Sequence, residues 1–159
     1  MVHTISELVA KVAKGIQEDF NQESCWVMIR TTLPNHEYDI PRWHVDGGYG
    51  GPNYEGKTYK LVFTVKGAPT RFAETIDKQK FNQLITQDPN GENMQTRKEL
   101  ETIVEENKPI SQDQATIYLV DDKNAKVHSE PPINESRIFM SVVPGSVEQI
   151  EKFKKRYEE

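Results

Sequence analysis

The chain has 159 residues, of which 35% are hydrophobic and 28% charged, and this balance predicts a single folded domain over 1–159. Its formal net charge of −5 argues against nucleic acid as a partner, because binding to phosphates needs clustered Lys and Arg. No apolar run approaches the ~20 residues that span a bilayer, so we expect no membrane partner and a cytoplasmic location.

The first predicted element is a helix over residues 4–20. Its apolar residues recur at helical spacing, with polar residues between them: Ile5, Leu8, Val9, Val12, Ile16 and Phe20. Thr4 and Glu7 match the S/T-x-x-E pattern that caps the start of a helix. A helix with one apolar face needs a partner surface, so we expect it to pack on a sheet.

After this helix the hydrophobic pattern takes a period of two, which indicates strands. We predict strands at 25–32, 57–66 and 70–75, and extended chain at 41–45. Cys25, at the start of the first strand, is the only cysteine. An intramolecular disulfide and a cysteine-based zinc site are therefore excluded.

The second half of the chain mixes the two periods. Residues 76–106 have helical character and are predicted to form a helical insertion. Strand patterning returns at 115–120, 127–128 and 137–143, and a last helix is predicted at about 146–157. Strands and helices do not alternate strictly, which argues against a parallel sheet. The pattern predicts a mainly β fold with flanking helices, arranged as a sandwich or barrel.

The four histidines differ in their surroundings. His3 lies at the start of the chain and His36 in a polar loop, and we expect no functional role for either. His44 and Asp46 are two residues apart, so on a strand both side chains point to the same face. An isolated H-x-D is common, and alone it fits a hydrogen-bonded surface pair as well as a metal site.

Three further features give the H-x-D pair its significance. His128 follows a predicted turn late in the chain, near the end of a strand. Arg137 comes nine residues later, where the final strand begins. The segment 67–72, Gly-Ala-Pro-Thr-Arg-Phe, follows the strand after the H-x-D pair.

In this order, the motifs resemble the signature of the Fe(II)/2-oxoglutarate-dependent dioxygenase superfamily. Its members bind iron with two histidines and one carboxylate on one face of the metal. The resemblance covers about residues 25–145 and implies a double-stranded β-helix, which is a jelly-roll or cupin-like fold. It also implies that His44, Asp46 and His128 are ligands of one Fe(II).

The same resemblance implies two contacts to 2-oxoglutarate as a cosubstrate. Arg137 would hold its far carboxylate, because a planar guanidinium suits a two-point contact with a carboxylate. The segment 67–72 is similar to a Gly-Gly-Asp-Thr-Leu-Phe-like segment of some members. Its Thr70 is therefore expected to contact the cosubstrate.

The activity implied by the resemblance is hydroxylation, or demethylation through hydroxylation, of a substrate that the sequence does not identify. Two alternatives remain open. The first is a metal-dependent cupin enzyme that does not use 2-oxoglutarate, although such enzymes more often show H-x-H with a later Glu and His. The second is a non-catalytic binding module, because Ile138 and Phe139 follow Arg137 where many oxygenases have Arg-x-Ser.

The surroundings of the H-x-D pair suggest where a substrate would lie. Arg42, Trp43 and Tyr49 flank the expected mouth of the site, where they either contact an anionic or aromatic group of the substrate or close the rim. Residues 47–56 hold five of the nine glycines and form a loop. This loop either makes tight turns or acts as a flap that closes Tyr49 over the substrate.

Overall fold

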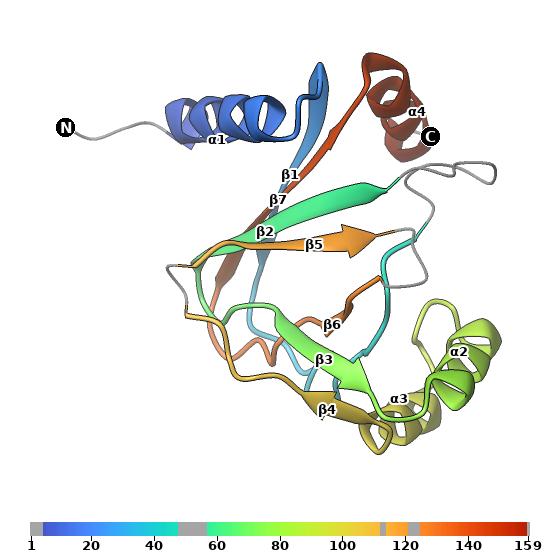
Figure 1. The fold of residues 1–159 in the computed structure, drawn as a ribbon. Coiled ribbons are helices and arrows are strands. Elements are labelled where there is room, and N and C mark those ends of the chain that lie inside the picture. The colour runs from blue at the N-terminus through green and yellow to red at the C-terminus, as the bar shows by residue number, and fades with distance from the viewer. Residues whose placement is uncertain (1–4, 48–56, 112–113, 121–124, 159) are drawn as a thin grey trace.

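The structure is a computed structural model that describes residues 5–47, 57–111, 114–120 and 125–158. The described residues form seven strands and four helices (Figure 1). In chain order these are α1 (Ile5–Asp19), β1 (Ser24–Thr32), β2 (Thr58–Lys66), β3 (Arg71–Thr75), α2 (Lys78–Gln87), α3 (Met94–Glu101), β4 (Val104–Glu106), β5 (Thr116–Val120), β6 (Val127–Ser129), β7 (Arg137–Gly145) and α4 (Val147–Glu158). The prediction of a mainly β protein with flanking helices is confirmed. No helix in these ranges has the length and apolar character needed to cross a bilayer.

Two antiparallel sheets make up the centre of the molecule. The first has the strand order β1-β7-β2-β5 and the second the order β4-β3-β6. An isolated antiparallel bridge between His44 and His128 adds the predicted extended segment 41–45 beside β6, on the side away from β3. The second sheet is therefore bordered by a fourth, irregular segment.

The chain passes repeatedly between the two sheets. It runs from β1 in the first sheet to His44 beside the second, returns to the first in β2, and then forms β3 and β4 in the second. It goes back to the first sheet in β5, to the second in β6, and ends in the first with β7. Segments far apart in the sequence thereby become neighbours, because β7 lies between β1 and β2.

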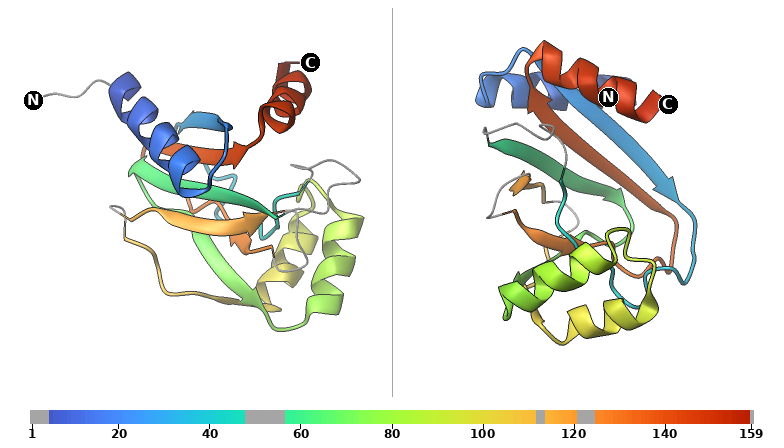
Figure 2. Two further views of the ribbon diagram at one scale, coloured as in Figure 1. Left: turned by 45° about the horizontal axis from the view of Figure 1, so that its top comes forward. Right: turned by 90° about the vertical axis from the view of Figure 1, so that its right-hand side faces the viewer.

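Hydrophobic clusters fill three layers around these sheets. One lies between the sheets and takes residues from both, including Phe72 of β3 and Phe139 of β7. A second joins α1 to the outer face of the first sheet through Ile16, as the apolar face of the predicted helix required. A third covers the outer face of the second sheet with α2 and α3. The two helix pairs, α1 with α4 and α2 with α3, lie at opposite ends of the molecule in every view (Figure 2).

The helical insertion is shorter than the 76–106 predicted from the sequence. Each of its helices starts at a capping side chain, Asp77 for α2 and Asn93 for α3. The last residues of the predicted insertion, Val104–Glu106, form the strand β4, which corrects the prediction of helix there. It pairs with β3, and the backbone N–H of Ile76 donates to the carbonyl of Ile103. The β-branched pair Ile103-Val104 suits this extended pairing better than a helix.

Candidate metal centre

The two histidines of the predicted site lie opposite each other on neighbouring chain segments. The N–H of His44 donates to the carbonyl of His128 at 3.0 Å, and the N–H of His128 donates to the carbonyl of His44 at 2.9 Å. The two imidazole rings pack with their centroids 4.3 Å apart. Because side chains of paired residues emerge on the same side of a sheet, the backbone itself brings the rings together.

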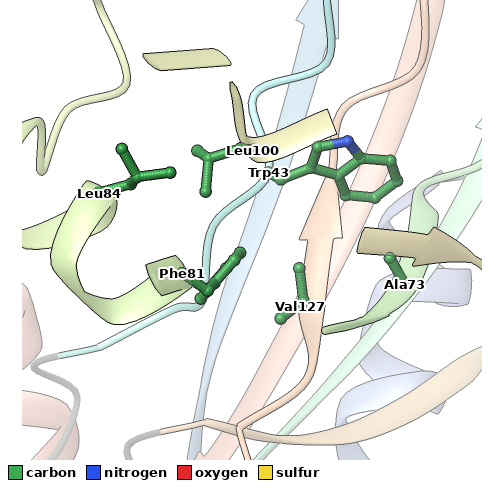
Figure 3. Close-up of a cluster of buried hydrophobic side chains, with 6 residues drawn as sticks. All are labelled: Trp43, Ala73, Phe81, Leu84, Leu100 and Val127. Carbon is green, nitrogen blue, oxygen red and sulfur yellow. The ribbon is translucent and has the colours of Figure 1, made fainter. Parts of the chain in front are cut away.

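The residues before the two histidines point to the opposite face. Trp43 and Val127 belong to the hydrophobic cluster under α2 and α3, where they pack with Ala73, Phe81, Leu84 and Leu100 (Figure 3). Only 2% of Trp43 is exposed. This cluster therefore holds the two segments in place from the face opposite the histidines. Trp43→Ala should lower the free energy of unfolding by about 3–5 kcal/mol, the usual range for a buried Trp.

Both imidazoles are oriented by backbone carbonyls. The Nδ1 atom of His44 lies 2.7 Å from the carbonyl oxygen of Arg42, and that of His128 lies 3.0 Å from the carbonyl oxygen of Lys126. A carbonyl only accepts, so each Nδ1 carries the hydrogen and each Nε2 keeps its lone pair for a ligand. Burial lowers the pKa of His44, and burial together with His44 lowers the pKa of His128 to about 4. Both rings are thus neutral at pH 7, which is the form that binds metals.

Asp46 is held on the same side by two donors from the first sheet. Its Oδ2 accepts from Lys60 Nζ at 2.8 Å and from the Tyr118 hydroxyl at 2.9 Å. Lys60 of β2 and Tyr118 of β5 are direct partners in the sheet. Burial alone would raise the pKa of Asp46, but the neighbouring His128 and Lys60 outweigh it and hold that pKa well below its usual value.

The three side chains have the donors and the spacing that one divalent ion needs. One ligand atom from each of His44, Asp46 and His128 lies within 4.8 Å of the others. The Nε2 of His44 is 3.9 Å from Asp46 Oδ1, and the Nε2 of His128 is 3.4 Å from Asp46 Oδ2. Metal bonds of ~2.1 Å at right angles bring neighbouring donors to about 3 Å. Small side-chain rotations close that difference, so the group fits.

The cluster opens into a cavity of about 170 Å³ between the two sheets. Met28, Arg30, Lys60, Tyr118, Arg137 and Phe139 line it from the first sheet, and Arg42, His44, Asp46, Thr70, His128 and Glu130 line it from the segments of the second. The cavity is rich in charge for its size. Among the described residues that line it there are four cationic side chains, Arg30, Arg42, Lys60 and Arg137, and two carboxylates, Asp46 and Glu130, and this imbalance favours an anionic ligand.

Arg137 lies in the wall of this cavity and is 3% exposed. Its Nε donates to the carbonyl of Ala68 at 2.9 Å, and its Nη2 donates to Thr70 Oγ1 at 3.0 Å. Within the described residues no carboxylate forms an ion pair with it. Burial lowers the pKa of Arg137 to about 10, so the guanidinium keeps its charge at pH 7. Arg137 is thus a buried cation without a bound counter-ion.

The three residues predicted to contact substrate, Arg42, Trp43 and Tyr49, differ in where they lie. Arg42 lines the cavity, where its Nη2 donates to Glu130 Oε1 at 2.8 Å. Trp43 does not line it, because its indole faces the cluster under α2 and α3, and this corrects the expectation that it touches substrate. Tyr49 and the flap proposed for it lie outside the described residues.

Six of the residues that line the cavity were not assigned to the site by the sequence analysis: Met28, Arg30, Lys60, Tyr118, Glu130 and Phe139. The alternation of residues 57–66 places Lys60 on the face opposite Tyr59, Leu61 and Phe63, and polar residues on a second face are usually exposed. The available signal for Lys60 was its position between apolar strand residues. His36, by contrast, is an exposed residue that pairs with Asp39 at 2.9 Å.

Comparisons of the chain with protein-family models, with curated proteins and with solved structures find no match.

Proposed function

We propose that this chain is an Fe(II)- and 2-oxoglutarate-dependent oxygenase that hydroxylates, or demethylates through hydroxylation, a small molecule or protein. The observation that carries the proposal is the buried, unneutralised Arg137 in the same cavity as His44, Asp46 and His128. A metal triad alone fits many enzymes. A metal triad with a separate cation for a carboxylate fits a cosubstrate that chelates a metal at one end and carries an anion at the other.

The strand order supports a double-stranded β-helix as the fold. A jelly-roll fold has eight strands in two facing sheets. Counting the segment at His44 as a strand beside β6, the second sheet has the order His44 segment, β6, β3, β4, and the first has β1-β7-β2-β5. The chain then alternates between two sheets of four, as such a fold requires.

The roles of the triad residues follow from their hydrogen bonds. His44 and His128 would bind the metal through Nε2, because each donates its Nδ1 hydrogen to a carbonyl. Asp46 would bind through Oδ1, because Lys60 and Tyr118 hold Oδ2. Three protein donors on one face leave positions for a small ligand, and two imidazoles with one carboxylate are typical of non-haem Fe(II).

At the other end of the cavity, Arg137 would bind the far carboxylate of 2-oxoglutarate. The hydrogen bond to Thr70 Oγ1 orients the guanidinium, and the ring of Phe139 lies 4.7 Å from its central carbon. Phe139 and Met28 add apolar surface to the cavity wall, and apolar surroundings strengthen charge-assisted hydrogen bonds. With bound Fe(II), the chemistry supplied would be oxidation of a substrate C–H bond by O₂, with conversion of 2-oxoglutarate to succinate and carbon dioxide.

A non-catalytic binding module is the second candidate, and the contact between Lys60 and Asp46 favours it. The ammonium lies 2.8 Å from a carboxylate that the metal needs, and it therefore competes with the metal. In a module without metal, Lys60 would stay paired with Asp46, and Arg137 would bind an anionic ligand directly. The two candidates differ in what they do with 2-oxoglutarate, since only the oxygenase consumes it.

The test is succinate formation by purified protein supplied with Fe(II), ascorbate, 2-oxoglutarate and air. We expect slow formation without substrate, and faster formation once substrate screening finds the right compound. Asp46→Ala and Arg137→Met should abolish it. Arg71→Met is the matched control, because Arg71 pairs with Glu106 and does not line the cavity. Wild-type protein that forms no more succinate than Asp46→Ala, while binding 2-oxoglutarate, would favour the module.

A further inference from the structure

Arg30 lies at the mouth of the cavity, near the end of β1. Its partner in the sheet is Phe139 of β7, and Arg137 stands two residues before Phe139, so both arginines face the same side of the first sheet. Both line the cavity. The side chain of Arg30 is 49% exposed, whereas only 3% of Arg137 is exposed. Arg30 therefore meets solvent at the opening, and Arg137 lies inside.

The carboxylate beside Arg30 already has another partner. Glu130 Oε1 accepts from Arg42 Nη2 at 2.8 Å. Arg30 Nη1 lies 3.8 Å from the same oxygen, which is too long for a hydrogen bond. Arg30 also donates to the Sδ of Met28 at 3.9 Å, and a thioether is a weak acceptor. Among the described residues, no carboxylate lies within hydrogen-bonding distance of Arg30.

The charge of the cavity favours a further anion at this place. Among the described residues that line the cavity, cationic side chains outnumber carboxylates. A divalent metal and the dianion 2-oxoglutarate would cancel each other's charge, so this excess would persist in the loaded site. Uncompensated charge beside apolar walls such as Phe139 is costly, and an anion at the mouth would reduce that cost.

We propose that Arg30 binds an anionic group of the substrate, namely a carboxylate, sulfate or phosphate, at the mouth of the cavity. Arg42 neutralises Glu130 and thereby leaves the Arg30 guanidinium for the ligand. Arg42 and Glu130 stand two residues from His44 and His128, and all four line the cavity. A substrate held by Arg30 would therefore extend its uncharged part toward the histidines. The assignment of the anion to a substrate rests on the proposed function, whereas the anion site itself does not.

A single anion held by Arg30 and Arg137 together is the rival arrangement. Burial lowers the pKa of Arg137, and the charge of Arg30 acts in the same direction, so the two guanidiniums interact. The hydrogen bonds from Arg137 to Ala68 and Thr70 hold its guanidinium inside the cavity, away from the exposed mouth. Two separate anion sites fit this difference better. The two arrangements differ in whether Arg30 contributes to the affinity for 2-oxoglutarate.

The experiment titrates sodium sulfate, as the probe anion, into metal-free Arg137→Met protein by calorimetry, with the ionic strength held constant by sodium chloride. This background lacks the inner guanidinium, so sulfate reports on the mouth. We expect one saturable sulfate per chain. Adding Arg30→Met should lower its affinity about tenfold, the scale for a lost charge-assisted hydrogen bond. Arg30→Lys keeps the charge and should retain more of the affinity than Arg30→Met.

A matched control and a second titration complete the design. Arg71→Met, added to the same background, should leave sulfate binding unchanged, because Arg71 pairs with Glu106 and does not line the cavity. A thermal unfolding scan of each variant reports whether it is folded. In Mn(II)-loaded protein, Arg30→Met alone should keep the 2-oxoglutarate affinity within about twofold of wild type, since a half-exposed charge that does not touch a ligand contributes little.

The outcomes separate this inference from the proposed oxygenase. Equal sulfate binding with and without Arg30→Met would overturn the anion site, even if the protein forms succinate. A loss of 2-oxoglutarate affinity in Arg30→Met as large as in Arg137→Met would also overturn it, because Arg30 would then serve the cosubstrate. The expected sulfate pattern without any succinate would support the anion site and count against the oxygenase. Where succinate is formed, Arg30→Met should raise the KM of the anionic substrate about tenfold and leave kcat nearly unchanged; an unchanged KM would overturn the assignment to substrate.

Discussion

The two ends of the cavity differ in how their charges are compensated. At the metal end, Asp46 accepts from Lys60 and Tyr118, so the carboxylate is neutralised within the protein. At the other end, Arg137 has only neutral acceptors, the carbonyl of Ala68 and the hydroxyl of Thr70. One end is complete without a ligand and the other is not.

This difference indicates which end depends on a bound molecule. When a ligand binds to one member of a buried ion pair, it displaces the other member. Part of the binding free energy is then offset by the loss of that ion pair. A buried guanidinium with neutral acceptors keeps a charge that a carboxylate can neutralise without displacing anything. We therefore expect Arg137 to supply most of the affinity for the anion, and the metal-binding residues to supply selectivity.

The largest effect is expected when a metal-binding residue is replaced. Asp46→Ala and His128→Ala should each lower the affinity for Fe(II) or Mn(II) more than a hundredfold, since even the partners of metal ligands contribute 10–100-fold. Calorimetric titration of the metal measures this. The exposed pair His36 and Asp39 offers the same residue types as a control. Loss of metal affinity in His36→Ala equal to that in His128→Ala would remove His128 from the site.

The second largest effect is expected when Arg137, at the other end of the cavity, is replaced. Arg137→Met should weaken 2-oxoglutarate binding by about 2 kcal/mol, or roughly thirtyfold, the scale for a lost charge-assisted hydrogen bond. The affinity for the metal alone should stay within about twofold of wild type. Titration of 2-oxoglutarate into the Mn(II)-loaded protein tests the first part. A variant that loses metal and anion together would show that the two ends are not separable.

Acid should act on the metal end alone. The folded-state pKa of His128 is about 4, below its usual 6.5, so the unfolded chain binds the proton more readily between these values. As pH falls from 7 to 5, the free energy of unfolding of metal-free protein should drop by about 2 kcal/mol from this group. The lowered pKa of Asp46 has the same sign but acts below about pH 4.

Denaturant titration at several pH values measures this loss. His128→Asn should remove the part of the slope between pH 7 and pH 5 that comes from His128, while His44, whose pKa burial also lowers, still contributes with the same sign. Arg137 stays charged throughout this range, because its pKa is about 10. A slope unchanged in His128→Asn would assign the acid sensitivity to other groups.

The smallest effect is expected when the hydrogen bond from Arg137 to Thr70 is removed. Thr70→Val removes the hydroxyl that accepts from Arg137 and should weaken 2-oxoglutarate by about 1 kcal/mol, roughly fivefold. Thr70→Ser keeps the hydroxyl and serves as the matched control. If Thr70→Ser loses as much affinity as Thr70→Val, the methyl packing of Thr70 and not its hydrogen bond is what matters.

Strands with regular alternation were predictable from the sequence. Residues 57–66 alternate clearly and 137–143 are rich in apolar residues, and the structure forms β2 and β7 there. The three-residue strand β4 was not found, because so short a segment cannot show a period of two, and its pairing with β3 is decided by tertiary contact.

The site was predictable to a similar extent. The spacing of His44 and Asp46 indicated a common face, and the structure brings them together with His128. Trp43 was assigned to the substrate because it adjoins His44, yet adjacent strand residues face opposite sides. Lys60 could not be assigned to the site, since its ion pair joins β2 of the first sheet to Asp46, which follows the segment beside β6, and such a contact leaves no local pattern.

The His44–His128 bridge has a kinetic consequence. The chain between residues 44 and 128 carries β2 to β5, so this contact closes a long loop and contributes to slow folding. A partly folded chain therefore lacks the assembled triad, and a metal would bind the native state in preference to any precursor. Interactions absent from the folding transition state slow unfolding without speeding folding. Bound metal should thus lengthen the lifetime of the native protein and leave its refolding rate nearly unchanged.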